Sequence, residues 1–232
     1  MHVFVTGISS GIGKAFLEYY LNEGVEVTGI GRTKASIDKQ YSFLESDFAD
    51  ISSIKKLSLK SHDDEIVLIN NAGTIGAIQR VSDQTTSDLE EVMLVNTIVP
   101  MLLCQKVIQE NPGKKITIVN ITSGAANRPI PSWAAYCSSK IALDRFSETL
   151  QLEENEKKAA TRVYSVAPGV VDSKMQEKIR QSSHLDFSSL DNFINLHSKG
   201  ELLDAKIVVN KLVALISKKD KTQVIYSIKE LD

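Results

Sequence analysis

A tyrosine and a lysine stand four residues apart, at Tyr136 and Lys140, and a helical pattern continues from Ile141 to Leu152. Residues at this spacing on a helix lie one turn above each other on the same face, so the phenol and the ammonium group would point the same way. A free tyrosine ionises near ~10, and a nearby positive charge favours the phenolate. The pair therefore predicts a phenol that gives or takes a proton nearer neutral pH. The alternative is an ordinary surface pair, since this spacing is common by chance.

A glycine-rich turn follows the first apolar run of the chain. The sequence reads Gly7-Ile8-Ser9-Ser10-Gly11-Ile12-Gly13 between the candidate strand His2 to Thr6 and a helical pattern. Glycines let the backbone approach a pyrophosphate, and a helix N-terminus offers unpaired N–H groups to its charge. The glycine spacing is wider than in the tightest dinucleotide fingerprint, so a simple strand-to-helix turn is the alternative.

Composition restricts the class of protein. The chain has 232 residues, 42% hydrophobic and 24% charged, which fits one soluble α/β domain over 1–232. Lys plus Arg total 27 against 29 for Asp plus Glu, so we expect neither nucleic acid nor a membrane as partner. The strand pattern starts at His2 without a basic or apolar leader, and no apolar run approaches the ~18 residues of a membrane span. We therefore expect a cytoplasmic protein.

The cysteines and histidines show no ligand spacing. Cys104 and Cys137 are expected to be reduced thiols. The four histidines are scattered along the chain, so we expect no metal.

Short β-rich apolar runs alternate with longer helical patterns, which is typical of βαβ units and a parallel sheet. The candidate strands are His2 to Thr6, Val25 to Ile30, Tyr41 to Glu45, Glu65 to Asn70, Lys115 to Thr122, Arg162 to Ala167 and Gln223 to Ser227. The candidate helices are Ile12 to Glu23, Ile51 to Lys60, Ser87 to Glu110, Trp133 to Lys157 and Asp204 to Lys218. The pattern predicts an α/β, single-domain, doubly wound Rossmann fold with a seven-stranded parallel sheet and helices on both faces. A polar, serine-rich segment at about 172–200 predicts a small helical lid.

Further motifs follow the later candidate strands. Asn71-Ala72-Gly73 comes after the fourth, Ser123 after the fifth and Pro168-Gly169 after the sixth. In a doubly wound sheet, ligands bind beyond the carboxyl ends of the strands. We therefore expect these motifs to converge with the glycine-rich turn on one crevice.

With these motifs in order, the chain resembles the short-chain dehydrogenase/reductase family over almost its whole length. The resemblance implies a catalytic set of Asn96, Ser123, Tyr136 and Lys140. The cofactor-binding residues that it implies are Gly7, Ser9, Ser10, Gly11, Ile12, Gly13, Arg32, Asp47, Asn71, Ala72, Gly73, Tyr136, Lys140, Pro168, Gly169, Val171 and Ser173.

The resemblance also implies a role for each catalytic residue. Tyr136 would give a proton to a substrate carbonyl oxygen while a nicotinamide gives hydride to its carbon. Lys140 would lower the pKa of the tyrosine and hold ribose hydroxyls, and Ser123 would orient the carbonyl. Asn96 would anchor a water for proton relay to the lysine; its alternative is a solvated helix position.

The cofactor is expected to be NADP(H). Arg32 follows the second candidate strand, where an arginine favours a ribose 2′-phosphate and an acidic residue would favour a free hydroxyl. Ser10 lacks the basic character that some NADP-using relatives have in the glycine turn. Asp47 matches the family position that reaches the adenine, with helix capping as its alternative. Ser173 stands where the family usually has threonine.

The substrate is expected to be a bulky or aromatic small-molecule ketone or diketone. Ile130, Pro131, Trp133 and Met175 are expected to form an apolar wall near the reacting carbonyl, unless Trp133 and Ile130 pack inward as loop core. The pattern is close to the sepiapterin-reductase-like branch, which includes bacterial benzil reductases.

Two other functions remain open. The enzyme alternative is a 3-oxoacyl-carrier-protein or polyol dehydrogenase on the same fold, and the other alternative is a non-catalytic NADP-binding sensor. The long helices over 87–110 and 133–157 resemble those that pair in the family, which implies a homodimer or a dimer of dimers.

Overall fold

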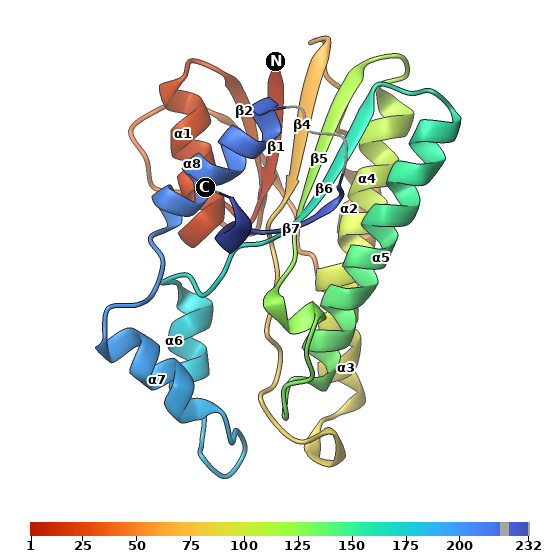
Figure 1. Ribbon diagram of the computed structural model, residues 1–232. Coiled ribbons are helices and arrows are strands. Elements are labelled where there is room, and N and C mark those ends of the chain that lie inside the picture. The colour runs from red at the N-terminus through yellow and green to blue at the C-terminus, as the bar shows by residue number, and fades with distance from the viewer. Residues whose placement is uncertain (219–222, 232) are drawn as a thin grey trace.

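The computed structural model describes residues 1–218 and 223–231 (Figure 1). Its centre is a parallel sheet of β1 (His2–Thr6), β2 (Glu26–Gly31), β3 (Ser42–Glu45), β4 (Glu65–Asn70), β5 (Lys115–Ile121), β6 (Thr161–Ala167) and β7 (Ile225–Ser227). The strand order is β3-β2-β1-β4-β5-β6-β7. The chain therefore winds outward from β1 in one direction and then, from β4, in the other. This confirms the predicted doubly wound sheet, whose switch point lies between β1 and β4.

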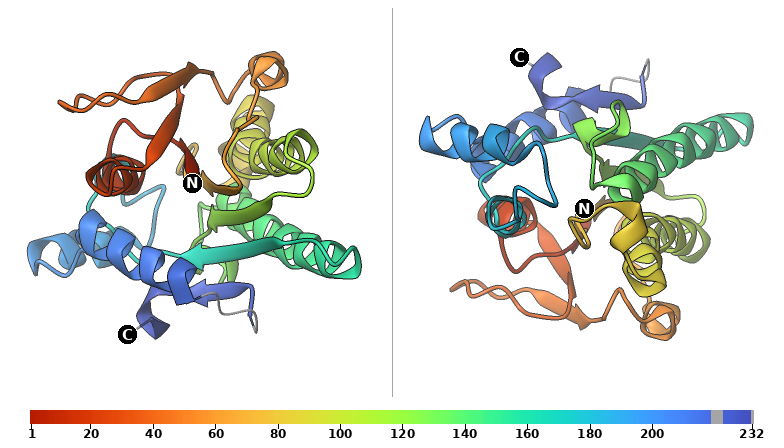
Figure 2. Two further views of the ribbon diagram at one scale, coloured as in Figure 1. Left: turned by 90° about the horizontal axis from the view of Figure 1, so that it is seen from above. Right: turned by 90° about the horizontal axis from the view of Figure 1, so that it is seen from below.

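Helices cover both faces of the sheet (Figures 1 and 2). Helices α1 (Gly11–Asn22) and α8 (Ala205–Lys218) pack on one face, and α2 (Ile51–Lys56), α4 (Val99–Glu110) and α5 (Ala134–Glu156) pack on the other. Successive strand residues point to opposite faces, so Val3 and Val5 join the first apolar cluster while Phe4 joins the second. Strands buried on both faces must be apolar at almost every position, which is why they are visible in the sequence.

The helical pattern predicted over 87–110 is not one continuous helix. It forms α3 (Thr86–Met93), a π-helical turn (Leu94–Ile98) and then α4. Pro100 lacks the N–H group that the Asn96 carbonyl would accept from in a regular α-helix, which favours a change of winding at this point. The prediction of one continuous helix is therefore wrong. π-Helical turns of this kind are frequent at functional sites.

Within the described residues, Thr86–Glu110 is the helical stretch whose length and mean hydropathy of 1.5 would suit a membrane span. In the fold, its parts contact α5, β4 and β5. This is the packing of a core helix of a folded domain.

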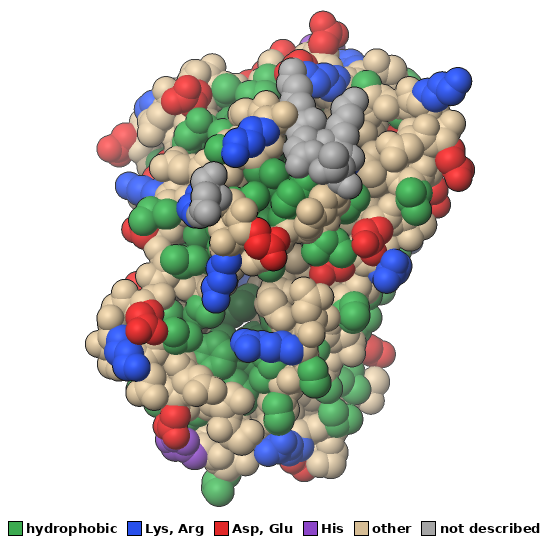
Figure 3. Space-filling view, viewed as in Figure 1, with side chains coloured by type: hydrophobic (Ala, Val, Ile, Leu, Met, Phe, Trp, Pro, Cys, Tyr) green, Lys and Arg blue, Asp and Glu red, His purple; other side chains and the backbone are tan. Residues whose placement is uncertain are grey.

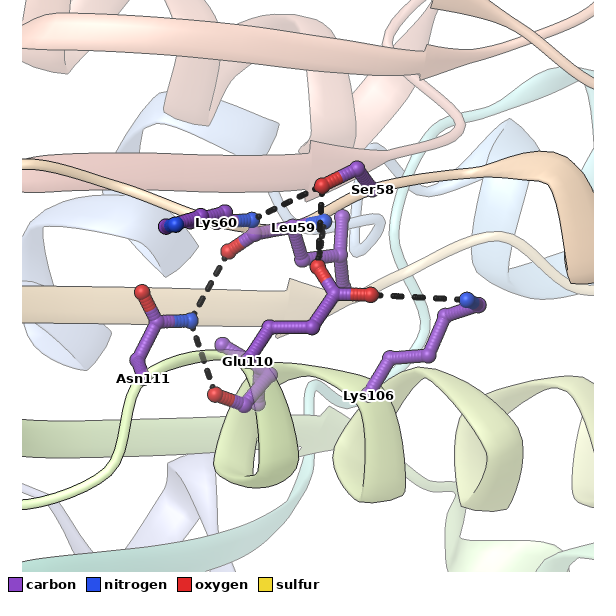
Figure 4. Close-up of polar contacts among 7 residues, drawn as sticks. Ser58, Leu59, Lys60, Lys106, Glu110 and Asn111 are labelled. Atoms are coloured by element: carbon purple, nitrogen blue, oxygen red, sulfur yellow. Dashed lines mark hydrogen bonds and ion pairs between the residues drawn. The ribbon is translucent and has the colours of Figure 1, made fainter.

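Buried polar bonds hold the end of α4 against the segment that precedes β4 (Figure 4). Nδ2 of Asn111 donates to the carbonyls of Leu59, at 2.9 Å, and Val107, at 2.8 Å, while its Oδ1 accepts from the Ser61 N–H at 2.9 Å. The Glu110 carboxylate accepts from the Leu59 N–H. These bonds fix α4, and with it the π-helical turn that carries Asn96.

The segment predicted as a lid contains α6 (Lys174–Arg180) and α7 (Leu190–Ser198), which lie beyond the carboxyl ends of the strands (Figure 1). A third apolar cluster joins them to the start of α5. In it, the Trp133 ring stacks on Phe187 with centroids 5.2 Å apart, and Phe193 and Ile179 pack beside them. The shorter 3-10 turns are η1 (Val81–Asp83), η3 (Gly124–Ala126) and η4 (Ile228–Glu230).

Candidate active site

A cleft of about 770 Å³ opens where the strands end. The space-filling view shows the molecule hollowed here, with apolar side chains inside the hollow (Figure 3). Every residue of the predicted catalytic and cofactor sets lines this cleft except Gly13 and Asn96. The predicted convergence of the motifs is therefore what the structure shows.

The glycine-rich turn is bonded directly to the loop after β4. The Thr6 hydroxyl accepts from the N–H groups of Asn71 and Ala72, both at 2.9 Å, and the Asn71 amide donates to the Thr6 carbonyl at 3.0 Å. Gly13 packs α1 onto this turn, because a Cβ there would lie 2.3 Å from the Gly7 carbonyl oxygen. Gly13 thus supports the turn from behind and does not line the cleft.

The start of α1 suits an anionic group. Within the described residues, the Ser10 side chain makes no capping bond to α1, and the first turn contains no acidic residue. Gly11 has φ of +56°, a conformation that glycine adopts without strain. The first N–H groups of α1 therefore lack a side-chain acceptor at the edge of the cleft, which fits the pyrophosphate of a dinucleotide.

Tyr136, Ser123 and Lys140 meet deeper in the cleft. Burial raises the pKa of the Tyr136 phenol, and a hydrogen bond with Ser123 offsets only part of that rise. The Lys140 ammonium donates to the Ile121 carbonyl at 2.9 Å and lies 5.8 Å from the centroid of the Tyr136 ring. Burial lowers the pKa of Lys140 to about 8, and the Asp144 carboxylate opposes that shift.

The expected lowering of the Tyr136 pKa is therefore wrong for the chain by itself. Burial of the phenol is the largest effect on its pKa, and the Lys140 ammonium donates to the Ile121 carbonyl. The raised pKa suits a proton donor, because the phenol keeps its proton at neutral pH.

Asn96 is completely buried in the π-helical turn, so the solvated alternative is wrong. Its Oδ1 accepts from the Thr74 N–H at 2.8 Å, and its Nδ2 donates to the Thr74 carbonyl at 2.8 Å and to the Ser139 hydroxyl at 3.1 Å. The side chain therefore ties the loop after β4 to α5.

Sequence reasoning missed Asp144. This carboxyl group lies one turn after Lys140 on α5, is 4% exposed and accepts from the Ser165 hydroxyl at 2.6 Å. Burial raises its pKa, and its charge in turn raises that of Lys140. The signal was available, since an acidic residue four positions after the lysine shares its helix face.

Arg32 lies exposed at the end of β2, where it lines the cleft. It has no ion-pair partner among residues 1–218 and 223–231, so its guanidinium group is available to an anionic ligand. Asp47 lines the same end and accepts from the Ala49 N–H at 3.0 Å. The residue that caps α2 is Asp50, so the capping alternative for Asp47 is wrong.

The apolar wall is partly as predicted. Ile130, Trp133 and Met175 line the cleft, whereas Pro131 is exposed and does not. Trp133 is buried in the third apolar cluster and also meets the Tyr136 ring edge-on, with centroids 5.6 Å apart. Trp133 therefore belongs to the apolar core and also lines the cleft, so both of the alternatives predicted for this residue hold.

A group that the sequence spacing did not show lies at the opposite end of the sheet. His2, Glu26 and Asp63 bring ligand-type atoms within 4.8 Å of one another. However, the two ring nitrogens of His2 bond the hydroxyls of Ser61, at 3.1 Å, and Thr28, at 2.8 Å. We assign no metal there.

Comparisons with known proteins agree with this geometry. Residues 1–184 match the family model of short chain dehydrogenases. A benzil reductase ((S)-benzoin forming) of Bacillus subtilis is 35% identical over 97% of both chains. A sepiapterin reductase of Bos taurus is 33% identical over 65% of this chain and 57% of that protein. The crystal structure of a short-chain dehydrogenase/reductase from Saccharomyces cerevisiae superposes with a TM-score of 0.84, at 27% identity, over 98% of this chain and 95% of that one. The chain belongs to the short-chain dehydrogenase/reductase family, a family of oxidoreductases that use a nicotinamide cofactor.

Proposed function

We propose that this chain is an NADPH-dependent carbonyl reductase that reduces a bulky aromatic ketone or diketone, such as benzil. The observation that carries the proposal is the meeting of a buried phenol, a hydroxyl and a buried ammonium group in one cleft with an uncapped helix N-terminus. The likeness to benzil reductases over nearly the whole chain supports this choice among oxidoreductases.

The residues of the chain divide the work of reduction. A bound NADPH supplies the hydride. Ser123 donates a hydrogen bond to the carbonyl oxygen and orients it, and Tyr136 gives its proton to that oxygen as negative charge develops there. Lys140, charged at neutral pH, holds ribose hydroxyls and stabilises the phenolate that remains. The Asn96 carbonyl holds a water through which the proton is replaced.

Arg32 selects the phosphorylated cofactor in this proposal, because a guanidinium group bonds a phosphate strongly and an aspartate would repel it. We predict that Arg32→Asp lowers the ratio of kcat/KM for NADPH to that for NADH by at least about tenfold. Lys34→Asp is the matched control, since Lys34 is exposed nearby but does not line the cleft. A wild type that prefers NADH, or an equal effect of both substitutions, contradicts this assignment.

Arg128 and Lys174 also line the cleft, and these basic residues are the feature that would favour the alternative function, a 3-oxoacyl-carrier-protein reductase. A basic mouth would suit an acidic acyl carrier protein, as a 3-oxoacyl reductase requires. The apolar wall of Ile130, Trp133 and Met175 favours an aromatic substrate instead.

The test is NADPH oxidation with benzil and with an acetoacetyl thioester. We expect a higher kcat/KM for benzil, and a change of that ratio in Trp133→Ala or Met175→Ala. Equal or better activity on the thioester, unmoved by both substitutions, discards the substrate class. A chain that binds NADPH but reduces no carbonyl compound would be the non-catalytic sensor.

We also propose a homodimer, or a dimer of dimers, that forms through α4 and α5. These helices and the π-helical turn expose Ile98, Met101, Ile141 and Leu152, with exposed fractions of 38–63%. Exposed large apolar side chains on neighbouring helices often mark an interface.

A further inference from the structure

Gln176 is a buried amide whose bonding is incomplete. The residue is 2% exposed and lines the cleft, and neither Nε2 nor Oε1 has a hydrogen-bond partner among the described residues. Buried polar side chains are nearly always bonded, since leaving one without a partner costs about 1–3 kcal/mol. A primary amide that lacks partners at both ends, beside a cleft, indicates a ligand group that pairs with it.

The position of Gln176 is fixed by its helix. Its backbone N–H donates to the Ser173 hydroxyl, which caps α6, at 3.3 Å. Ile179 lies three residues further on the same helix face and belongs to the apolar cluster of Trp133. The side chain of Gln176 is therefore on the face of α6 that meets the apolar wall of the cleft.

The wall contains a second polar atom without a partner. Trp133 is 5% exposed and lines the cleft, and its Nε1 has no acceptor among the described residues. The reacting carbonyl already has donors in Ser123 and Tyr136. Donors carried by Gln176 and Trp133 therefore suit an additional oxygen on the substrate.

We propose that Gln176, assisted by Trp133 Nε1, binds the second carbonyl oxygen of a vicinal diketone and so selects diketones over monoketones. The inference rests on the proposed function and adds a residue that recognises the part of the substrate that does not react.

The test compares two ketones that differ in one group. Benzil has two adjacent carbonyls between its rings, and deoxybenzoin has a methylene in place of one of them. In Gln176→Met, which keeps the length of the side chain without its polar atoms, kcat/KM for benzil should fall at least about tenfold while that for deoxybenzoin stays within about twofold. Trp133→Phe should reduce the same preference. Comparing variants with the wild type cancels the greater intrinsic reactivity of the diketone.

Two controls identify the bound group. Gln181→Met changes an exposed glutamine at the end of α6 and should leave both substrates unaffected. The KM for NADPH should be unchanged in Gln176→Met; a rise there, with the benzil preference intact, would mean that the amide pairs with the cofactor and would overturn the proposal. Gln176→Glu, which keeps the shape but repels a carbonyl oxygen, provides the same comparison should the methionine variant fail to fold.

The outcomes separate this inference from the function on which it rests. A wild type that reduces both ketones, with a ratio that Gln176→Met leaves unchanged, overturns the inference alone. A wild type that reduces neither ketone overturns the proposed function, and this inference with it.

Discussion

Burial has opposite effects on the two proton-carrying groups of the site. It raises the pKa of the Tyr136 phenol and lowers that of Lys140 to about 8. At neutral pH the phenol therefore keeps its proton, and most of the lysine is charged. In the proposed mechanism, the acid for carbonyl reduction would therefore be in place before the reaction, together with a cation that would stabilise the phenolate left by it.

The pH dependence of the activity follows from the lysine. Because its pKa is lowered to about 8, Lys140 loses its charge as the pH rises through that value, and kcat/KM should fall there. Asp144→Asn removes the carboxylate that raises the pKa of Lys140, so the alkaline limb of the pH profile should move to lower pH. The Ser165 hydroxyl can still donate to the new amide oxygen.

The control for this prediction is Glu153→Gln, which neutralises an exposed carboxylate on the same helix. It should leave the pH profile in place. A profile that is the same in Asp144→Asn and in the wild type would show that Asp144 does not tune the lysine.

The motif residues could be predicted from the sequence because their order and spacing identify them, whether or not their side chains are buried. The spacing of Asp144 from Lys140 places the two on one helix face, but neither the burial of Asp144 nor that of Gln176 could be predicted from the sequence. An acidic residue on a helix and a glutamine in a polar segment are ordinarily exposed, and only the packed structure shows that these two are enclosed.

At the scale of elements, the strands are close to the prediction because each is a short apolar run that ends in glycine, asparagine or a loop. The helix over 87–110 was predicted as one piece because hydrophobic periodicity does not distinguish a π-helical turn from an α-helical one. Pro100, four residues after Asn96, was the signal for the break.

The polar bonds at the end of α4 predict a stability effect far from the cleft. Asn111→Ala would leave the carbonyls of Leu59 and Val107 and the N–H of Ser61 without their partner in a buried place. We expect a loss of about 2–4 kcal/mol in the free energy of unfolding, measured with urea.

Asn210→Ala, at an exposed position on α8, is the matched control and should change stability by less than about 0.5 kcal/mol. Equal stability of the Asn111 and Asn210 variants would show that α4 is not held by this network.

At the scale of the molecule, the charges are balanced and apolar side chains are exposed along α4 and α5. If this face forms the proposed dimer, Met101→Lys combined with Ile141→Lys should give a monomer by light scattering at micromolar concentration. Leu185→Lys is the control, because Leu185 is 91% exposed but lies in the segment between α6 and α7. A monomeric wild type, or dissociation by the Leu185 substitution alone, contradicts this interface.

The central claim is that Tyr136 supplies the proton in an NADPH-dependent carbonyl reduction, and Tyr136→Phe tests it most directly. The substitution removes one hydroxyl and keeps the ring that packs against Trp133. The measurement pairs kcat for benzil reduction with the Kd for NADPH, obtained by titration of the same preparation. The account predicts a fall in kcat of at least about 10²-fold to 10⁴-fold with the Kd for NADPH nearly unchanged. Substantial turnover by the phenylalanine variant would contradict it.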